Sequence, residues 1–286
     1  MKHFTAHAPT HCTIDDAQRG LANREFFFVY QPKLRMGEGR LSGFESLLRW
    51  NHPSFGVLAP ASFIHLVEDS PLTGSFTDFI TADATRTLAD WSVRGYDTLS
   101  LAINLPAAEI ARPGLASKLS ALCCSRSVRT SRLQIELTES SDPGSIEKLA
   151  SAVESLKKSG ISVAIDDFGA GCWSLAILHR LGVDTLKLDR KFMCGIQDNA
   201  NSKVVVESLI ELGQRLGKRV VIEGIETAEQ FAWLKTIEQI ECQGYYISAP
   251  VADEQIGELV ARHGMVHQAP VKILESSRMK MASGSR

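Results

Sequence analysis

Short apolar segments alternate with longer amphipathic ones along most of the chain. Eight of the short segments are rich in β-branched, aromatic and leucine residues and have the length of a strand. We predict a β-strand in each of them: residues 26–32, 40–50, 99–105, 133–139, 162–168, 185–189, 219–224 and 242–248.

The intervening segments have the periodicity of helices. In residues 144–160 apolar side chains recur every three or four positions, and Gly160 stands where a helix C-cap belongs. One helix face then carries Ile146, Leu149, Ala150, Val153 and Leu156. Residues 106–123 and 201–217 have similar patterns. The chain therefore alternates strand and helix.

Regular strand–helix alternation favours parallel strands joined by right-handed crossovers. Eight such units over this length indicate an α/β fold, a TIM-like (β/α)8 barrel, rather than an open sheet. The first two strands are joined only by residues 33–39, which are too few for a crossover helix. We therefore predict that the first strand is antiparallel.

The ends of the chain have little periodicity. We expect residues 1–14 and 267–286 to be tails, and residues 15–266 to form one domain. The 286 residues provide enough apolar side chains for a large core.

Composition narrows the range of partners. The net charge of −2 gives no reason to expect binding to polymeric nucleic acid. We expect no membrane span, because no segment approaches about 18 consecutive apolar residues. The six cysteines form no CxxC pair, which is typical of the reducing cytoplasm.

Polar residues recur within or at the C-terminal ends of the predicted strands. All strand C-termini of such a barrel open onto one face, where the active site lies. A single carboxylate at a strand end is more often a helix cap or part of a surface ion pair than a catalytic group. Together they form a candidate site: Glu45, Asn104, Glu136, Glu139, Asp166, Asp167, Lys187, Asp189, Glu223 and Gln243.

The charge of this site indicates bound cations. Five negative charges would meet in one partly buried pocket, and Lys187 returns only one positive charge. Two divalent ions would balance the sum, and oxygen ligands without His or Cys select Mg²⁺ or Mn²⁺. Asn104 fits as a neutral oxygen ligand. The five charged groups are Glu45, Glu136, Asp166, Asp167 and Glu223.

Adjacent carboxylates on an ideal strand point to opposite faces. Asp166 and Asp167 can both enter one pocket only where the strand gives way to a turn. We expect the glycines of the following FGAG sequence, residues 168–171, to allow that turn. One of the pair could then bridge two ions, the arrangement used for in-line displacement at phosphorus.

In the order of its motifs the chain resembles the EAL-domain family of bacterial cyclic di-GMP phosphodiesterases. The resemblance covers about residues 24–250, and the Glu-Ala-Leu motif of the family corresponds to ESL at 45–47. The other motifs are QP at 31–32, NL at 104–105, ELTE at 136–139, DDFGAG at 166–171, KLD at 187–189, EGIET at 223–227 and QGYY at 243–246.

This resemblance implies a TIM-like barrel with an antiparallel first strand and hydrolysis of cyclic di-GMP to linear pGpG. It implies two Mg²⁺ or Mn²⁺ ions per site and inhibition by Ca²⁺. The expected ligands of the first ion are Glu45, Asn104, Glu136 and Asp166, and those of the second are Asp166, Asp167 and Glu223.

By the same resemblance, Lys187 would contact the nucleophilic water and Glu223 would be the general base. Glu139 would anchor the loop after Asp167. The residues expected to line the substrate channel are Gln31, Leu48, Arg49 and Gln243.

The chain departs from the family pattern at several positions. Ser46 replaces the alanine of the Glu-Ala-Leu motif, and Pro106 stands where the family usually has serine. Cys172 and Trp173 replace tyrosine and serine in the region that forms the family's dimer interface. The resemblance therefore implies a homodimer through the region after Asp167, and leaves open how these substitutions affect it.

Two other functions stay open at this point. The chain could be a receptor that binds cyclic di-GMP without hydrolysing it, although such family members generally lack a metal ligand that this chain keeps. It could also be an unrelated Mg²⁺-dependent barrel enzyme acting on carbon acids, which would explain the acidic residues but not the ordered motifs.

Overall fold

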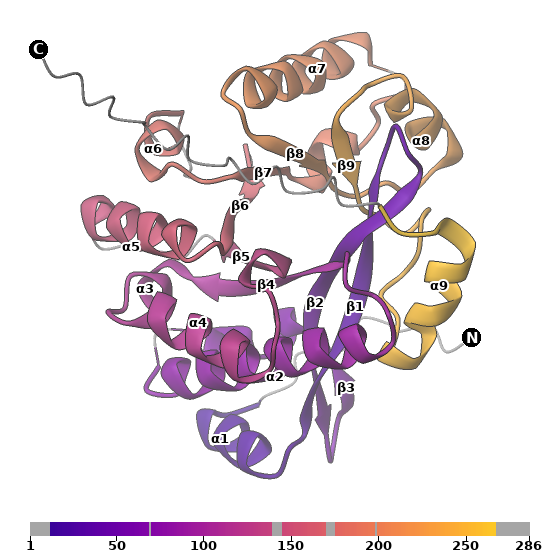
Figure 1. Cartoon of the computed structure of the whole chain (residues 1–286). Coiled ribbons are helices and arrows are strands. Elements are labelled where there is room, and N and C mark those ends of the chain that lie inside the picture. The colour runs from indigo at the N-terminus through magenta and orange to yellow at the C-terminus, as the bar shows by residue number, and fades with distance from the viewer. Residues whose placement is uncertain (1–11, 69, 139–144, 170–174, 198, 267–286) are drawn as a thin grey trace, which may run out of the picture.

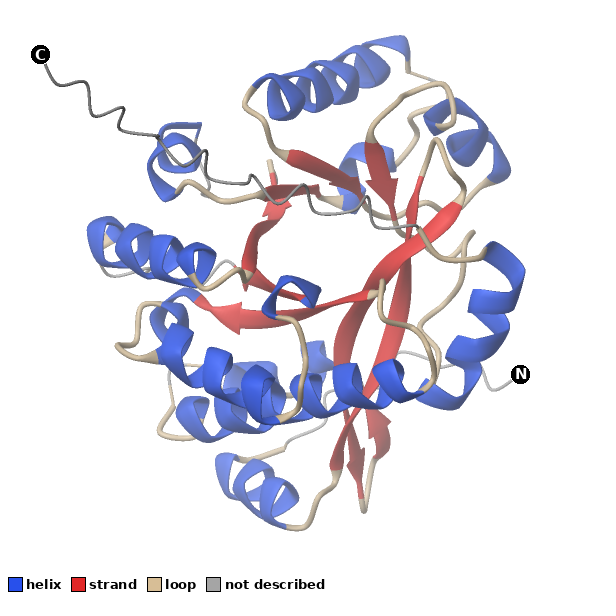
Figure 2. Cartoon of the chain, viewed as in Figure 1, coloured by secondary structure: helices blue, strands red, loops and turns tan. Residues whose placement is uncertain are grey.

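The computed structural model describes residues 12–68, 70–138, 145–169, 175–197 and 199–266 (Figure 1). A ring of strands lies at the centre and helices cover its outside (Figure 2). Within the described residues the strands are β1 Phe26–Arg35, β2 Arg40–His52, β3 Gly56–Leu58, β4 Ser100–Pro106, β5 Leu133–Thr138, β6 Ser162–Phe168, β7 Thr185–Leu188, β8 Arg219–Ile222 and β9 Ile240–Cys242.

Eight of these strands close into a barrel, because β1 pairs with β9 on one side and with β2 on the other. Both pairings of β1 are antiparallel, whereas β2, β4 and the following barrel strands run parallel. The short connection between β1 and β2 leaves no room for a crossover helix. The predicted α/β barrel with an antiparallel first strand is confirmed.

Helices connect most of the parallel strands and bury their apolar faces against the outside of the barrel. The α-helices are α1 Ile14–Ala22, α2 Thr73–Val93, α3 Ala107–Ile110, α4 Leu115–Ser125, α5 Ile146–Lys158, α6 Leu175–Leu181, α7 Ala200–Arg215, α8 Ala228–Leu234 and α9 Ile256–His263. Short 3₁₀ helices lie at Pro60–Ser62, Ile64–Leu66, Thr130–Arg132, Arg190–Met193 and Asp253–Gln255.

Helix α5 illustrates how the sequence pattern becomes structure. The Ser145 side chain caps its N-terminus, and Leu149, Val153 and Leu156 are buried against the barrel. Gly160 follows with φ of +81°, a left-handed conformation that glycine adopts without steric cost.

Two strands differ from the predicted ones. The short strand β3 extends the sheet beyond β2 and was not predicted. The last strand ends at Cys242, and residues 244–247 form a turn in place of the predicted strand 242–248. Gly244 passes so close to Ile225 that an added Cβ would lie 2.2 Å from its backbone nitrogen. A side chain larger than that of glycine would therefore not fit at this position.

Helix α1 is the first element of the described chain, and residues 267–286, expected to form the C-terminal tail, lie outside the described residues. Helix α1 begins at Ile14, and the Thr13 side chain forms a capping box with Asp16. Helix α1, the β1–β2 pair and β3 enclose a second apolar cluster, which includes Phe26, Trp50 and Phe63.

Candidate active site

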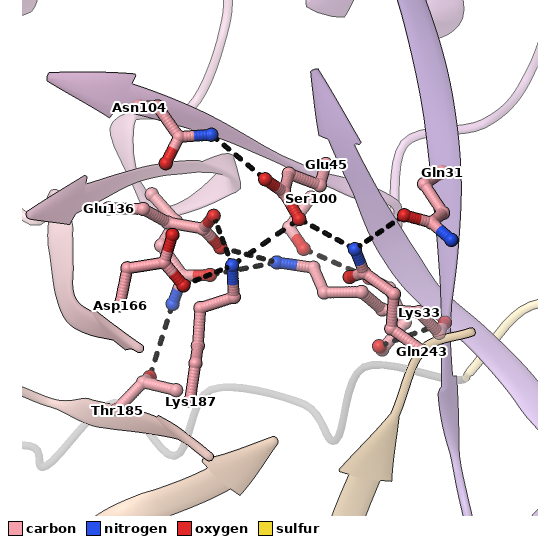
Figure 3. A network of polar contacts seen from close by, with 12 residues as sticks. Gln31, Lys33, Glu45, Ser100, Asn104, Glu136, Asp166, Thr185, Lys187 and Gln243 are labelled. Atoms are coloured by element: carbon pink, nitrogen blue, oxygen red, sulfur yellow. Dashed lines mark hydrogen bonds and ion pairs between the residues drawn. The ribbon is translucent and has the colours of Figure 1, made fainter. Parts of the chain in front are cut away.

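The polar residues at the strand ends converge at one end of the barrel interior (Figure 3). Neighbouring strands carry them at matched register: Gln31 pairs with Glu45, and Asn104 pairs with Glu136. Because partnered residues point to the same face of a sheet, these side chains enter one pocket. Six strands and the residues directly after β8 and β9 contribute the group Gln31, Glu45, Asn104, Glu136, Asp166, Lys187, Glu223 and Gln243.

Lys187 lies at the centre of this group and is 1% exposed. Its Nζ lies within ion-pairing distance of four carboxylates: Glu136 at 2.7 Å, Asp166 and Glu223 at 2.8 Å, and Glu45 at 3.3 Å. Burial lowers the pKa of Lys187, but the four carboxylates outweigh burial and hold the pKa well above its ordinary value. Lys187 is therefore a fixed positive charge.

One lysine cannot keep all the carboxylates ionised. Burial raises the pKa of Glu136 to about 7 and that of Glu223 to about 8, because the attraction of Lys187 only partly offsets the loss of water. Burial also raises the pKa of Glu45, but Lys187 and hydrogen bonds from Gln243 and Asn104 lower it to about 2. The pocket has more acidic groups than its own cations neutralise.

The carboxylates form two groups that could each hold a metal ion. One comprises Glu45, Glu136 and Asp166, and the other Asp166, Asp167 and Glu223. Within each group the candidate ligand oxygens lie within 4.8 Å of one another. Asp166 belongs to both groups, so the two candidate ion sites adjoin.

Asn104 supplies a further oxygen. Its Nδ2 donates to Glu45 Oε1 at 2.8 Å, and its Oδ1 is buried without a hydrogen-bond partner in the described part of the structure. A buried acceptor without a donor is costly, and a cation would satisfy it. The oxygen-only donor set thus fits a hard divalent ion.

A distortion of β6 brings Asp166 and Asp167 to the same pocket. The pairing of β6 with β7 is irregular between Ile165 and Phe168, and Asp167 has φ of 49°. Aspartate is among the residues that tolerate this left-handed conformation. The left-handed backbone begins at Asp167, within the strand, and recurs at Gly169 with φ of 93°, the first of the glycines expected to allow the turn.

A second buried lysine was missed in the sequence. Lys33 on β1 is 1% exposed, and its Nζ lies 3.5 Å from Glu136 Oε1. The charge of the pocket is thus less negative than we counted from the sequence. The position of Lys33 in the sequence could have indicated that it faces the pocket. Lys33 follows Gln31 by two residues and so points to the same side of the strand.

Two cavities flank the carboxylates. A cavity of about 300 Å³ is largely apolar and is lined by Leu47, Leu48, Ile64 and Phe76, and it reaches Asn104 and Asp166. A cavity of about 190 Å³ lies on the side of Glu223 and is lined by Gln31, Arg190, Gln243 and Tyr245.

The residues expected to line the substrate channel therefore lie on both sides. Gln243 Nε2 donates to Gln31 Oε1 at 2.9 Å and to Glu45 Oε2 at 2.6 Å, so the two glutamines are held together. Leu48 lines the larger cavity, and the half-buried Arg49 donates to the Leu48 carbonyl at 2.7 Å. Burial lowers the pKa of Arg49, although a guanidinium stays charged.

Among the departures from the family pattern, Ser46 and Pro106 both line the larger cavity. Glu139, Cys172 and Trp173 lie outside the described residues.

The fold and the site define a (β/α)8-type barrel with a carboxylate pocket at its strand ends. Residues 14–250 match the EAL domain family. The chain therefore belongs to the EAL domain family, as the sequence motifs indicated.

Known relatives agree with this assignment. The chain is 31% identical over 248 residues to a Pseudomonas aeruginosa protein named bifunctional diguanylate cyclase/cyclic di-GMP phosphodiesterase MucR, covering 87% of this chain and 36% of the relative. It is 34% identical over 237 residues to cyclic di-GMP phosphodiesterase PA2567 of the same species, covering 83% of this chain and 40% of the relative. The chain thus spans little more than a third of the length of these relatives.

The fold is also similar to a solved structure. The structure described as PaMucR phosphodiesterase, c-di-GMP complex, superposes with a TM-score of 0.78 at 31% identity, and the match covers 85% of this chain and 98% of that one. Among the described residues, no helix has both the length and the apolar character needed to cross a membrane.

Proposed function

We propose that this chain is a phosphodiesterase that hydrolyses cyclic di-GMP to linear pGpG with the aid of two divalent cations. The observation that carries this proposal is the pair of three-carboxylate groups that share Asp166. The names of the relatives supply the substrate: both are called cyclic di-GMP phosphodiesterases.

In this proposal the first ion is held by Glu45, Asn104, Glu136 and Asp166, and the second by Asp166, Asp167 and Glu223. Two adjoining ions would activate a water molecule and stabilise the charge on the attacking and leaving oxygens. The charge balance supports this assignment. Five carboxylates and two buried lysines leave three negative charges, and two divalent ions with one phosphodiester would neutralise the pocket.

The residues of the chain itself position and deprotonate the reactants. Lys187 supplies a fixed ammonium group amid the carboxylates, suited to hold the attacking water by a hydrogen bond. Glu223 is the proposed general base. Its carboxylate lies 2.8 Å from Lys187 Nζ, so it would lie beside the water that Lys187 holds.

The two cavities are suited to an elongated ligand with polar and flat apolar parts. The larger one, lined by Leu47 and Leu48, would accept a nucleobase, and the smaller one would take the other half of the dinucleotide. Gln31 and Gln243 would donate to the ligand across the smaller cavity. Arg49 is suited to a phosphate oxygen, because a guanidinium binds oxyanions through two parallel hydrogen bonds.

The test is a turnover assay on purified, metal-stripped protein with cyclic di-GMP. We expect pGpG to form with Mg²⁺ or Mn²⁺, and product formation to stop with a chelator or with Ca²⁺. Glu45→Gln and Asp166→Asn should each remove turnover. The matched control is Glu241→Gln, which changes a buried carboxylate outside the two groups and should keep turnover.

No pGpG from folded protein with bound Mn²⁺ would refute the proposal. Tight binding of cyclic di-GMP without turnover would instead identify a receptor.

Two further properties belong to the same proposal. We expect a homodimer through the region after Asp167. Leu175 at the start of α6 supports this expectation, because its large apolar side chain has 58% of its surface exposed. Sedimentation at micromolar concentration would detect it, and a monomer would contradict it. We also expect the enzyme to act in the cytoplasm, which fractionation would test.

A further inference from the structure

Beneath the candidate ion sites lies the second buried lysine, Lys33. Its Nζ donates to Gln134 Oε1 at 2.8 Å and lies 3.5 Å from Glu136 Oε1 (Figure 3). Among the two carboxylate groups in the described chain, Glu136 is the one member that Lys33 contacts. A fully buried lysine is uncommon and needs compensation by charge or hydrogen bonds.

Lys33 and Lys187 hold opposite oxygens of the same carboxylate. Lys33 lies against Glu136 Oε1, and Lys187 lies 2.7 Å from Glu136 Oε2. Glu136 is completely buried, so bulk solvent does not reach its carboxylate. Rotation of its carboxylate would break one contact or the other. The two ammonium groups therefore fix the direction in which Glu136 presents its oxygens.

Lys33 is itself fixed from across the barrel. Gln134, whose Oε1 accepts from Lys33, donates through its Nε2 to Thr185 Oγ1 at 3.1 Å. These three side chains link β1, β5 and β7 through the barrel interior.

The interior at this level has space for the lysine because its other residues are small. Ala102 pairs with Gln134 and Ala164 pairs with Thr185, so both alanines face inward at this level. At Gly43 an added Cβ would lie 2.1 Å from Ser100 Oγ. A long side chain from β1 can therefore cross to β5.

We propose that Lys33, supported by Gln134, is a positioning residue that holds Glu136 in the orientation needed to ligate the first divalent ion. This inference rests on the proposed function only in taking Glu136 as a metal ligand. Some residues contact a metal ligand rather than the metal itself. Removing such a residue typically lowers metal affinity or activity about 10–100-fold.

The test is calorimetric titration of metal-stripped protein with Mn²⁺, which needs no turnover. Lys33→Met keeps an unbranched apolar stem and removes the ammonium group. We expect its Mn²⁺ affinity at the tighter site to fall at least about tenfold. We also expect a lower kcat at saturating Mn²⁺ with an unchanged KM for cyclic di-GMP, since Lys33 lines neither of the two cavities proposed to hold the nucleotide.

A double-mutant cycle shows whether Lys33 acts through Glu136. In a Glu136→Gln background, adding Lys33→Met should change Mn²⁺ affinity by less than about twofold. A full additional loss in that background would overturn the proposal. The exchange Lys33→Gln with Gln134→Lys restores an ammonium group beside Glu136 from the opposite strand and should recover part of the affinity.

The matched control is Arg132→Met, which removes another buried cation, one that donates to backbone carbonyls outside both carboxylate groups. It should lower the melting temperature and leave Mn²⁺ affinity unchanged. If Lys33→Met behaves in the same way, Lys33 has only a structural role and the proposal is wrong.

A second variant covers the case in which Lys33→Met does not fold. Gln134→Leu removes the support of Lys33 without removing a charge, and should weaken Mn²⁺ binding several-fold; unchanged binding would contradict the proposal. Wild-type protein that binds Mn²⁺ without turnover would refute the phosphodiesterase function but leave these titrations decisive for Lys33. Wild-type protein that binds no Mn²⁺ would refute both.

Discussion

Lys187→Met should destabilise the metal-free protein much more than the metal-loaded protein. The change leaves four buried or partly buried carboxylates without the ammonium group that lies 2.7–3.3 Å from them. In the loaded protein, divalent ions would supply positive charge to the same oxygens. The methionine keeps most of the apolar stem, so the comparison isolates the charge.

The size of the expected destabilisation follows from the burial of the ion pairs that Lys187 forms. Removing one partner of a buried ion pair costs about 3 kcal/mol at the lower end of its usual range. For a chain of this size each kcal/mol lowers the melting temperature by about 2–4 °C, so we expect a decrease of about 6–12 °C in EDTA. With saturating Mn²⁺ the decrease should be less than half as large, because the bound ions would supply the positive charge that the variant lacks.

The assay is thermal unfolding followed by circular dichroism, in EDTA and in Mn²⁺, with wild-type protein in parallel. The control is Lys218→Met, since the part-buried Lys218 donates to the Val183 carbonyl away from the site. Its effect should be the same in both buffers. An equal decrease for Lys187→Met in EDTA and in Mn²⁺ would refute the view that Lys187 and the metal ions neutralise the same carboxylates.

Four further substitutions test other parts of the structure. Arg132→Met removes a guanidinium that donates to three backbone carbonyls, and should lower the free energy of unfolding by about 3 kcal/mol in a urea titration; a loss below 1 kcal/mol would contradict this. Gly43→Ala places a methyl group against Ser100 and should cost about 1–3 kcal/mol in the same experiment. Asp167→Asn keeps a residue that tolerates φ of 49° but removes a charge, so it should lower the number of bound Mn²⁺ ions from two to one without a large change in melting temperature; two bound ions would contradict its role. Leu47→Trp should fill the larger cavity and raise the KM for cyclic di-GMP while Mn²⁺ affinity stays unchanged, whereas an unchanged KM would show that the ligand does not enter that cavity.

The barrel could be predicted from the sequence because its causes are local. Each strand has its own apolar pattern, and the seven residues 33–39 are too short for any connection except a hairpin. The convergence of the acidic residues follows from the same reasoning, since parallel strands end at one face.

Features that depend on contacts between distant segments could not be predicted in this way. The side of β1 that Lys33 faces follows from its spacing to Gln31, but its contact with Gln134, 101 positions away, does not. The turn after β9 brings Gly244 close to Ile225, 19 positions earlier in the chain. The bulge at Asp167 reflects how β6 pairs with β7. Each of these features involves contacts between segments that are distant in the sequence. A single sequence does not show which distant segments are in contact.

The most direct test of the account is anomalous diffraction at the manganese edge from crystals soaked in Mn²⁺. We expect two adjoining peaks that share Asp166 as a ligand. One should lie among Glu45, Asn104, Glu136 and Asp166, and the other among Asp166, Asp167 and Glu223. Crystals with ordered side chains at these positions and no anomalous peak among them would contradict the account.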